Sequence, residues 1–405
     1  MPVRPNEEEL QEFLTRAVAE VIVRDDLAAL LRAAERPLRI KMGFDPTQPN
    51  LHIGHAIGLR KLRQLAQWGH EIVLIIGDYT TQIGDPTDRS ESRPMISHET
   101  VLENARTYLE QFHKIVPRES TRVVYQTEWY ATFGLKDVFH LASRFTVQQM
   151  LAREEFRKRQ AAGTAIPVKD LLYPLLQAYD SVAIEAEVEF GGTDQKFNIL
   201  AGRELQEMLG LRAQQVFLVQ MLEGTDGLVM SKTKRQTAIW LLDPPDVAFG
   251  KVMSIPDEVM PHYFEWGTTL PVIEMRSTLD ALARKELHPR DAKDRLARRI
   301  VSELHSEAAA EDAARAFARQ FREGRAPEAI PDAPVRSDGE RAVGIVDLLV
   351  RARLQPSRGA ARRLVEQRGV KVDEVLADLA TTVPTDREAV IRYGPRSFAR
   401  IRWIA

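Results

Sequence analysis

The chain has 405 residues, of which 44% are hydrophobic and 28% are charged, which is ordinary for a globular protein of two or three domains. It contains no cysteine, and this excludes disulfides, thiolate nucleophiles and cysteine-based zinc sites. The formal net charge is −2, but residues 341–405 hold 13 Lys and Arg against 7 Asp and Glu, a basic surplus that a solvated face explains as simply as RNA binding.

The N-terminal residues predict neither export nor a membrane span. Residues 1–9 lack an apolar signal core, and no uninterrupted apolar run reaches the roughly 20 residues needed to cross a bilayer. We therefore expect a protein without membrane spans and, because cysteine is absent, a cytoplasmic one. Asn6 and Glu9 have the spacing of a capping box, and the apolar spacing after them predicts one helix to about Ala34.

A strand, a helix and a second strand are predicted next. Leu38–Phe44 alternates apolar and polar residues, residues 51–68 carry apolar side chains at helical spacing, and Glu71–Ile76 is almost entirely apolar. The last run fits a strand buried on both faces of a parallel sheet, and Thr121–Tyr125 predicts another strand of that sheet. In such a unit the helix N-terminus lies at the carboxyl edge of the sheet, where free N–H groups and the helix dipole favour phosphate.

Two histidines occupy the first turn of that helix. His52 and His55 can form hydrogen bonds to a phosphate, and Gly54 between them leaves room for a flat base or a ribose. No glycine-rich dinucleotide or P-loop motif is present, and the alternative is that both imidazoles only cap and fill the turn. The loop Gly77–Pro86 is expected at the same edge, where Asp85 can bind a cationic group.

Polar side chains gather again in the middle of the chain. Tyr173, Gln177 and Asp180 stand at i, i+4 and i+7, so they share one helix face. A solvent-facing polar stripe is the alternative. Val188–Gln195 predicts a strand that ends in a glycine turn, which again brings polar side chains to a strand's carboxyl end.

The last part of the chain predicts a loop, a helical region and a small α+β domain. Residues 226–234 form a turn-rich loop around Lys232, and such a cationic loop could close over a polyphosphate leaving group. Residues 246–323 predict helices rich in Ala, Arg and Glu. Two short helical patterns and two strand-like runs follow, at residues 345–354, 357–368, 370–373 and 397–403.

These patterns resemble, in order and spacing over nearly the whole chain, the motifs of the bacterial tyrosyl-tRNA synthetases, a family of class I aminoacyl-tRNA synthetases. Asp45-Pro-Thr47 followed by His52-Ile-Gly-His55 matches the first signature of that family in full. Val229-Met230-Ser231-Lys232-Thr233 resembles the second, Lys-Met-Ser-Lys-Ser, with Val229 in place of the first lysine and Thr233 in place of the last serine.

The resemblance implies an α/β fold with a Rossmann-like parallel-sheet catalytic domain, then an α-helical domain and a small α+β S4-like RNA-binding domain. The expected limits are residues 1–240 for the catalytic domain, with a dimer-contact insertion at about 130–190, residues 241–323 for the helical domain on the anticodon side, residues 324–341 for a linker and residues 342–405 for the S4-like domain. The resemblance also implies a homodimer.

The resemblance assigns roles to individual residues as well. It implies that the α-amino group of tyrosine is held by Asp85, Tyr173 and Gln177, its carboxylate by Gln195 and its phenolic hydroxyl by Asp180, with Asp45 in the same subsite. It implies ATP contacts from Gly43, Gly54, Gly192, Asp194, Met230, Ser231 and Lys232, and catalysis at the phosphates by Thr47, His52, His55 and Lys232. Many members of the family carry a tyrosine where this chain has Lys41.

The implied substrates are L-tyrosine, ATP and tRNA(Tyr), with Mg²⁺ accompanying the phosphates and no structural metal. RNA contacts are expected from Arg358, Arg362, Arg363 and Lys371. Two alternatives remain open. A tryptophan enzyme of the same class should lack the carboxylate at Asp180 and the S4-like tail, whereas a non-catalytic RNA-binding protein on a synthetase scaffold would explain the departures at Lys41 and Val229.

Overall fold

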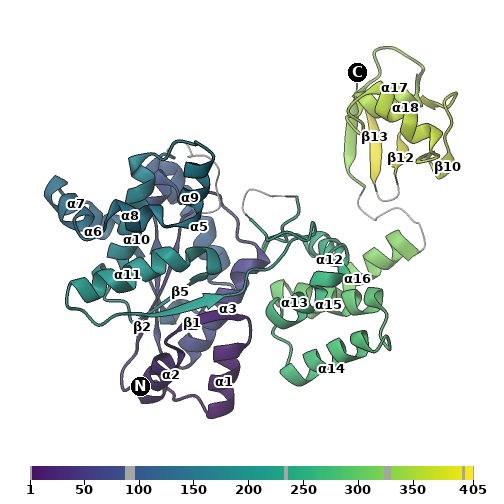
Figure 1. Cartoon of the computed structure of the whole chain (residues 1–405). Coiled ribbons are helices and arrows are strands. Elements are labelled where there is room, and N and C mark those ends of the chain that lie inside the picture. The colour runs from purple at the N-terminus through teal and green to yellow at the C-terminus, as the bar shows by residue number, and fades with distance from the viewer. Residues whose placement is uncertain (1, 87–95, 232–235, 323–329, 395–396, 405) are drawn as a thin grey trace. The chain divides into compact units, whose positions relative to one another are not determined.

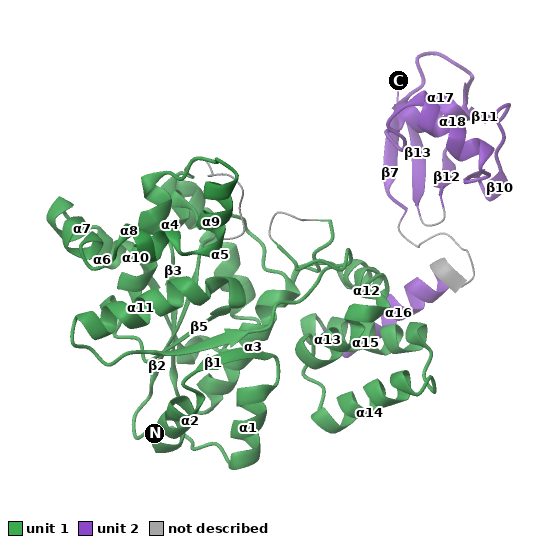
Figure 2. Cartoon of the chain, viewed as in Figure 1, with its two compact units in different colours: residues 1–305 green, residues 306–405 purple. Residues whose placement is uncertain are grey.

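A six-stranded sheet organises the first of two structural units, which comprise residues 1–305 and residues 306–405 (Figure 2). The structure is a computed structural model and describes residues 2–86, 96–231, 236–322, 330–394 and 397–404. The strands of this sheet are β1 (Val18–Ile22), β2 (Arg39–Phe44), β3 (Glu71–Ile76), β4 (Thr121–Tyr125), β5 (Val188–Gly192) and β6 (Gln215–Val219). The four strands expected from the sequence in this unit are thus confirmed.

The strand order is β1-β6-β5-β2-β3-β4, with β5 and β2 at the centre of the sheet (Figure 1). Strands β2 to β6 are parallel, whereas β1 runs antiparallel to β6. From β2 the chain adds β3 and β4 on one side, and later adds β5 and β6 on the other. Connections that leave neighbouring strands in opposite directions open a binding crevice at the carboxyl ends of those strands, here β2 and β5.

Helices connect these strands and continue beyond them. Those of the sheet region are α1 (Glu7–Thr15), α2 (Arg24–Ala33), α3 (Ile53–Gln67), α4 (Thr80–Ile83), α5 (His98–Phe112), α6 (Thr127–Tyr130), α7 (Leu135–Ala142), α8 (Val147–Leu151), α9 (Glu154–Ala161), α10 (Val168–Ala183) and α11 (Lys196–Met208). The 3₁₀ turns are η1 (Arg118–Ser120), η2 (Thr193–Gln195) and η3 (Asp257–Val259). The remaining helices of the unit are α12 (Pro245–Met253), α13 (Met260–Trp266), α14 (Val272–Ala283) and α15 (Pro289–Leu304). Among the described residues no helix is long and apolar enough to cross a membrane.

The apolar run at Glu71–Ile76 is the centre of the core. Every residue from Ile72 to Ile76 is at most 1% exposed, as expected of a strand covered on both faces. The helix predicted before it is α3, which ends at Gln67 and is followed by Gly69, whose φ of +82° is a conformation that glycine adopts without strain.

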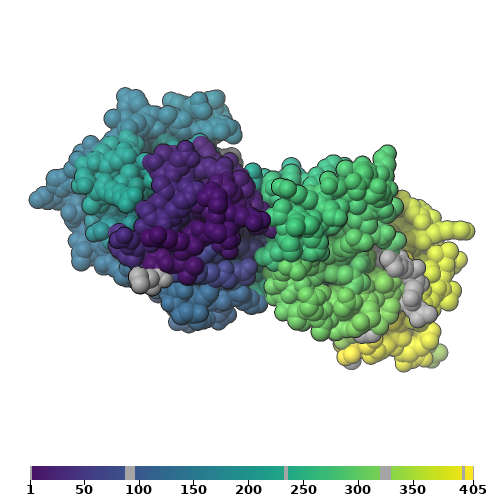
Figure 3. Space-filling view, turned by 90° about the horizontal axis from the view of Figure 1, so that it is seen from below, coloured from purple at the N-terminus to yellow at the C-terminus, as the bar shows by residue number. Residues whose placement is uncertain are grey.

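The single N-terminal helix predicted to about Ala34 is wrong. The capping box at Asn6 and Glu9 forms, but α1 ends at Thr15 and the segment Val18–Ile22 becomes strand β1. Helical spacing alone did not reveal this, because the β-branched side chains of this segment are compatible with a strand and β6 offers the backbone partner. In Figure 3 the purple N-terminal segment and the teal segment around residue 200 lie side by side, where Lys196 and Glu20 form an ion pair at 2.6 Å.

The second unit begins with α16 (Glu307–Arg322) and continues as a small α+β domain. Its other elements are β7 (Asp332–Arg336), β8 (Ala342–Gly344), α17 (Ile345–Arg351), α18 (Arg358–Glu366), β9 (Val370–Val372), β10 (Val375–Leu376), β11 (Thr382–Pro384), β12 (Ala389–Tyr393) and β13 (Phe398–Ile404). Five strands form a sheet in the order β10-β9-β12-β13-β7, and β11 pairs with β8. The two helices and two strands predicted here are confirmed as α17, α18, β9 and β13.

Part of the stretch expected as a linker is a strand. Residues 332–336 form β7, which pairs in parallel with β13, and Val335 is 2% exposed in the core of this unit. The prolines and charges of the stretch predicted a linker, but β7 lies at the edge of its sheet, where a proline such as Pro334 is tolerated.

Candidate active site

A cavity of about 580 Å³ lies at the carboxyl ends of β2 and β5. Most of the residues singled out in the sequence line it: Gly43, Asp45, Thr47, His52, Gly54, His55, Asp85, Tyr173, Gln177, Asp180, Gly192, Asp194, Gln195, Met230 and Ser231. Lys232 lies outside the described residues. The cavity thus brings together side chains from segments that are far apart in the sequence, as the expected sheet edge required.

Helix α10 supplies one wall of the cavity. Tyr173 donates a hydrogen bond from its hydroxyl to Asp45 Oδ2 at 2.8 Å, and Thr80 Oγ1 donates to Asp45 Oδ1 at 2.7 Å. Burial and the nearby carboxylate of Asp45 raise the pKa of Tyr173 well above its usual range, so Tyr173 is a neutral hydrogen-bond donor. The polar face expected on this helix therefore points into the cavity and not to solvent.

Asp180 is the buried carboxylate of that face. Only 3% of the residue is exposed, and its Oδ2 accepts a hydrogen bond from Gln126 Nε2 at 2.7 Å. Its Oδ1 accepts from Trp129 Nε1 at 3.2 Å and from the Tyr130 hydroxyl at 3.4 Å. Burial raises the pKa of Asp180 to about 7, although the positive charge of Lys41 and the Gln126 hydrogen bond act in the opposite direction.

Gln126 is a functional candidate that the sequence analysis missed. Its Oε1 accepts hydrogen bonds from the Tyr79 and Thr80 N–H groups at 3.2 and 2.9 Å, so its amide is oriented with Nε2 towards Asp180. Gln126 is the first residue after β4 and also lines the cavity. The signal that could have identified it is the one used for Asp85, a polar residue in the segment that follows a parallel strand at the carboxyl edge of the sheet.

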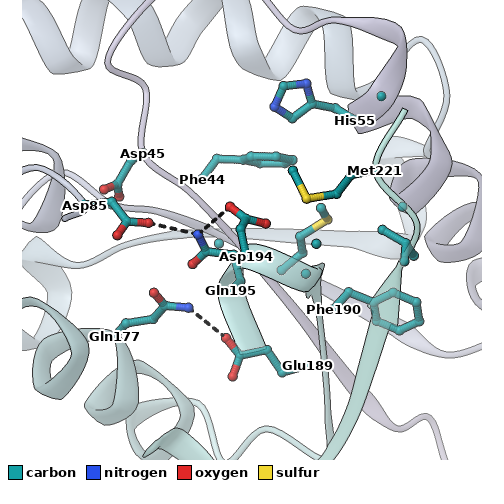
Figure 4. A pocket seen from close by; sticks show the side chains of 18 of the residues that line it. Phe44, Asp45, His55, Asp85, Gln177, Glu189, Phe190, Asp194, Gln195 and Met221 are labelled. Carbon is teal, nitrogen blue, oxygen red and sulfur yellow. Dashed lines mark hydrogen bonds between the residues drawn. The ribbon is translucent and has the colours of Figure 1, made fainter. Parts of the chain in front are cut away.

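On the wall of the cavity opposite α10, a chain of hydrogen bonds connects the polar side chains (Figure 4). Gln195 Nε2 donates to Asp85 Oδ2 at 2.9 Å and to Asp194 Oδ2 at 3.1 Å, while Asn198 Nδ2 donates to Gln195 Oε1 at 3.0 Å. Arg153 also lies 3.6 Å from Asp85 Oδ1. The carboxylates of Asp85 and Asp194 are thereby held at the cavity surface by one amide.

The turn that contains both histidines is packed against the segment that follows the lysine loop. Ile53 N donates to Ile239 O at 2.8 Å, and Leu241 N donates to Leu51 O at 2.9 Å. The imidazole rings of His52 and His55 lie with centroids 3.9 Å apart and planes tilted by 50°, and His52 N donates to His55 Nδ1 at 3.2 Å. The first signature is therefore held against the segment that follows the lysine loop.

Comparisons with known proteins point to one family. Residues 33–322 match the tRNA synthetases of class I (W and Y), and residues 343–388 match the S4 domain. A tyrosine–tRNA ligase of Dehalococcoides mccartyi is 48% identical over 395 residues, which cover 97% of this chain and 98% of that protein. The tyrosine–tRNA ligase of Thermotoga maritima is 42% identical over 97% of each chain.

The chain belongs to the tyrosine–tRNA ligases of class I. Membership in this family makes the chain a ligase and decides against the tryptophan enzyme and the non-catalytic RNA-binding protein. It also identifies residues 343–388 as an S4 domain, so the expected fold class is confirmed.

Solved structures share the family's fold. The tyrosyl-tRNA synthetase of Archaeoglobus fulgidus complexed with L-tyrosine aligns with a TM-score of 0.61 at 21% identity, over 76% of this chain and 99% of that one. A C-terminally truncated mitochondrial tyrosyl-tRNA synthetase of Aspergillus nidulans gives 0.62 at 20% identity, over 78% and 94%. At these identities the likeness shows the fold alone.

In the S4 domain of this family member the expected RNA-binding side chains are exposed or partly exposed. The side chain of Arg358 is 74% exposed and lies 3.1 Å from Asp347, and that of Arg362 is 65% exposed and lies 3.0 Å from Glu366. Arg363 is exposed, and Lys371 is partly exposed at the start of the β9–β10 hairpin.

Proposed function

We propose that the chain activates L-tyrosine with ATP to tyrosyl-adenylate and pyrophosphate, and then transfers the tyrosyl group to the 3′ end of tRNA(Tyr). The observation that carries this proposal is buried Asp180, a carboxylate held between the side chains of Gln126 and Trp129 in the cavity wall. A phenolic hydroxyl can donate to it, whereas phenylalanine would leave a buried charged acceptor without that partner, which is costly.

The remaining tyrosine contacts follow from the polar groups around the cavity. We assign the α-amino group to Asp85, Tyr173 and Gln177, and the α-carboxylate to Gln195. Asp45 acts through Tyr173: its carboxylate accepts a hydrogen bond from the Tyr173 hydroxyl and so orients that hydroxyl. Carboxylate and carbonyl acceptors suit an ammonium group, and an amide N–H suits a carboxylate.

The nucleotide is assigned to the glycine-lined side of the cavity. Gly43 and Gly192 let the adenosine approach the backbone, and a Cβ added to Gly43 would meet no atom within 4 Å. Gly54, Met230 and Ser231 complete this wall, and Asp194 accepts hydrogen bonds from the ribose. Thr47, His52 and His55 face the phosphates together with Lys232, which lies outside the described residues.

Mg²⁺ is assigned to the ATP phosphates and not to the protein. Within the described part of the chain, no three His, Asp or Glu side chains are grouped so that they could hold a metal ion. The groups offered to the phosphates, Thr47, His52 and His55, are hydrogen-bond donors. A metal ion that accompanies the phosphates would neutralise part of their negative charge.

The reaction needs no side-chain nucleophile and no general base. The tyrosine carboxylate attacks the α-phosphate, the bond to the β-phosphate breaks and pyrophosphate leaves. A ribose hydroxyl of the tRNA then attacks the carbonyl carbon of the adenylate, the bond from that carbon to the phosphate oxygen breaks, and AMP leaves with the hydroxyl proton on its phosphate. The protein aligns the two substrates and places donors where negative charge grows on the leaving phosphates.

A homodimer formed through the insertion at about residues 130–190 is the second part of the proposal. Four large apolar side chains are strongly exposed there: Leu135 by 69%, Phe139 by 63%, Val147 by 59% and Val168 by 71%. Their helices α7, α8 and α10 lie on the same side of the first unit (Figure 1). An apolar surface of this kind is typical of a protein–protein interface. A cytoplasmic location is proposed with it, since tRNA charging serves translation.

The experiment that tests the function is exchange of labelled pyrophosphate into ATP, with tyrosine, tryptophan or phenylalanine offered separately. Exchange with tyrosine alone is expected. Exchange with tryptophan would refute the role given to Asp180, and no exchange with any of the three would refute the activation step.

A further inference from the structure

A buried ion pair lies beneath the tyrosine subsite and has no role in the function proposed above. Lys41 on β2 and Glu189 on β5 are 0% and 2% exposed, and Lys41 Nζ lies 2.9 Å from Glu189 Oε1. These two strands are the neighbours between which the chain order reverses. The pair therefore spans the floor of the crevice.

Lys41 acts through its neighbours and not on a ligand. Its three ammonium protons are accounted for by Glu189 Oε1, by Ser181 Oγ at 2.7 Å and by the backbone carbonyl of Gln177 at 3.1 Å. Two of these partners belong to α10, the helix that carries Asp180. The ammonium group thus ties β2 to the wall of the cavity.

Glu189, in contrast, lines the cavity. Its Oε1 accepts a hydrogen bond from Gln177 Nε2 at 3.4 Å, as Figure 4 shows. Its Oε2 accepts from Ser181 Oγ at 3.0 Å and from Gln214 Nε2. Gln177 is consequently held at two points, its carbonyl by Lys41 and its side-chain amide by Glu189.

The pair also provides the full charges beside Asp180. Lys41 lowers the pKa of Asp180 and Glu189 raises it, with burial as the larger cause of the raised value. The other titratable groups facing Asp180 are the hydroxyls of Tyr130 from α6 and Tyr173 from α10, and both have pKa values raised well above the usual range, so they stay neutral. A change in either member of the pair therefore changes the charge that Asp180 experiences.

We propose that Lys41 and Glu189 form a paired positioning element of the tyrosine subsite, which fixes Gln177 and balances the charge next to Asp180. The inference rests on the proposed tyrosine activation. It gives Lys41, which replaces a tyrosine found in many members of the family, a role without any ligand contact. The two residues should therefore be functional as a pair and not singly.

The test is the pH dependence of kcat/KM for tyrosine in pyrophosphate exchange, compared between the wild type, E189Q, K41M and the double variant. The acid limb of this profile reports the ionisation of Asp180 in the free enzyme. E189Q removes a negative charge, so the acid limb should move to lower pH by about one unit. K41M should move it to higher pH by a similar amount, because it removes the positive charge that lowers the pKa of Asp180, while Glu189 keeps its three hydrogen-bond donors.

In the double variant the acid limb should lie close to that of the wild type. The same variant should raise KM for tyrosine more than KM for ATP, because Gln177 loses its hydrogen bonds to both Lys41 and Glu189. The matched control is K61M. Lys61 is another buried lysine, 7% exposed, whose Nζ donates to the carbonyl of Phe13 at 2.7 Å, so K61M should lower stability without moving the acid limb.

The inference would be overturned if the acid limbs of the wild type and E189Q coincided. It would also be overturned if K61M displaced the acid limb as far as K41M does. If K41M does not fold, E189Q is compared with the double variant instead. The inference then requires the acid limb of E189Q to lie at lower pH than that of the double variant. Absence of tyrosine-dependent exchange in the wild type would instead refute the proposed function, so the two failures are distinguishable.

Discussion

At the scale of single residues, Asp180 is proposed to select for the tyrosine hydroxyl, but burying its charged carboxylate lowers the stability of the fold. Burial raises its pKa to about 7, so the folded chain keeps the proton up to a higher pH than the unfolded chain, in which the pKa has an ordinary value near 4. Below pH 4 both states are protonated. Between about pH 4 and 7 the unfolded state releases this proton first, so stability falls as pH rises.

Two effects of Asp180→Asn are therefore expected. The stability of the wild type relative to the variant should fall as pH is raised from 5 to 8, as measured by urea unfolding at each pH. kcat/KM for tyrosine should fall by about 10- to 100-fold, since a hydrogen bond to a charged group is lost. A stability difference that does not change with pH would contradict the raised pKa of Asp180.

At the scale of elements, the first turn of α3 depends on Gly54. A Cβ there would lie 2.9 Å from His52 Nδ1, so Gly54→Ala must displace the imidazole. We expect kcat/KM for ATP to fall by about 10- to 100-fold in exchange assays, because positioning errors near the reacting phosphates are costly. Gly250→Ala is the control: this helical glycine has no atom within 4 Å of the added Cβ, and its replacement should stabilise the chain by about 1 kcal/mol without loss of activity.

The turn between β1 and α2 stores backbone strain. Val23 has φ +56° and ψ +63°, a left-handed conformation that β-branched residues rarely adopt, and it is 45% exposed. Val23→Gly should stabilise the chain by about 1 kcal/mol, measured as a higher urea midpoint at unchanged slope. Val23→Ala removes a similar exposed side chain but keeps Cβ, and its gain should be smaller. Equal gains would assign the effect to the side chain and not to the backbone.

At the scale of the whole molecule, chemistry and RNA binding are assigned to different units. The triple variant R358A/R362A/R363A removes three positive charges from exposed positions of the S4 domain. Pyrophosphate exchange, which needs no tRNA, should be unchanged, whereas KM for tRNA(Tyr) in aminoacylation should rise about tenfold or more and depend less steeply on salt. Equal loss in both assays would indicate damage to the fold.

The proposed dimer is tested at the same scale. Phe139→Asp places a charge on the exposed apolar residues of α7, α8 and α10, so we expect a monomer by light scattering, because an unpaired charge in an apolar interface is strongly unfavourable. Ile273→Asp on α14 is the control, since Ile273 is 85% exposed outside this region. A dimer in both variants would place the interface elsewhere.

The sequence by itself determined those features of this protein that follow from residue spacing within a single helix or strand. Helical spacing brought Tyr173, Gln177 and Asp180 to one face, and the apolar run at Glu71–Ile76 identified a strand covered on both sides. Both follow from the fixed periods of helix and strand. Parallel strands then required the polar strand ends to meet at one edge, which predicted the place of His52, His55 and Asp85, whereas the resemblance to the family supplied further cavity residues such as Thr47 and Asp194.

Only the tertiary structure decided which residues support that set. Gln126 reaches Asp180 from the end of β4. Lys41 meets Glu189 because β2 and β5 are neighbours in the sheet, although helices α3 to α10 lie between these two strands along the sequence. The strand β1 likewise exists because β6 offers its backbone to it. Such contacts depend on strand order and register, which no local pattern of residues encodes.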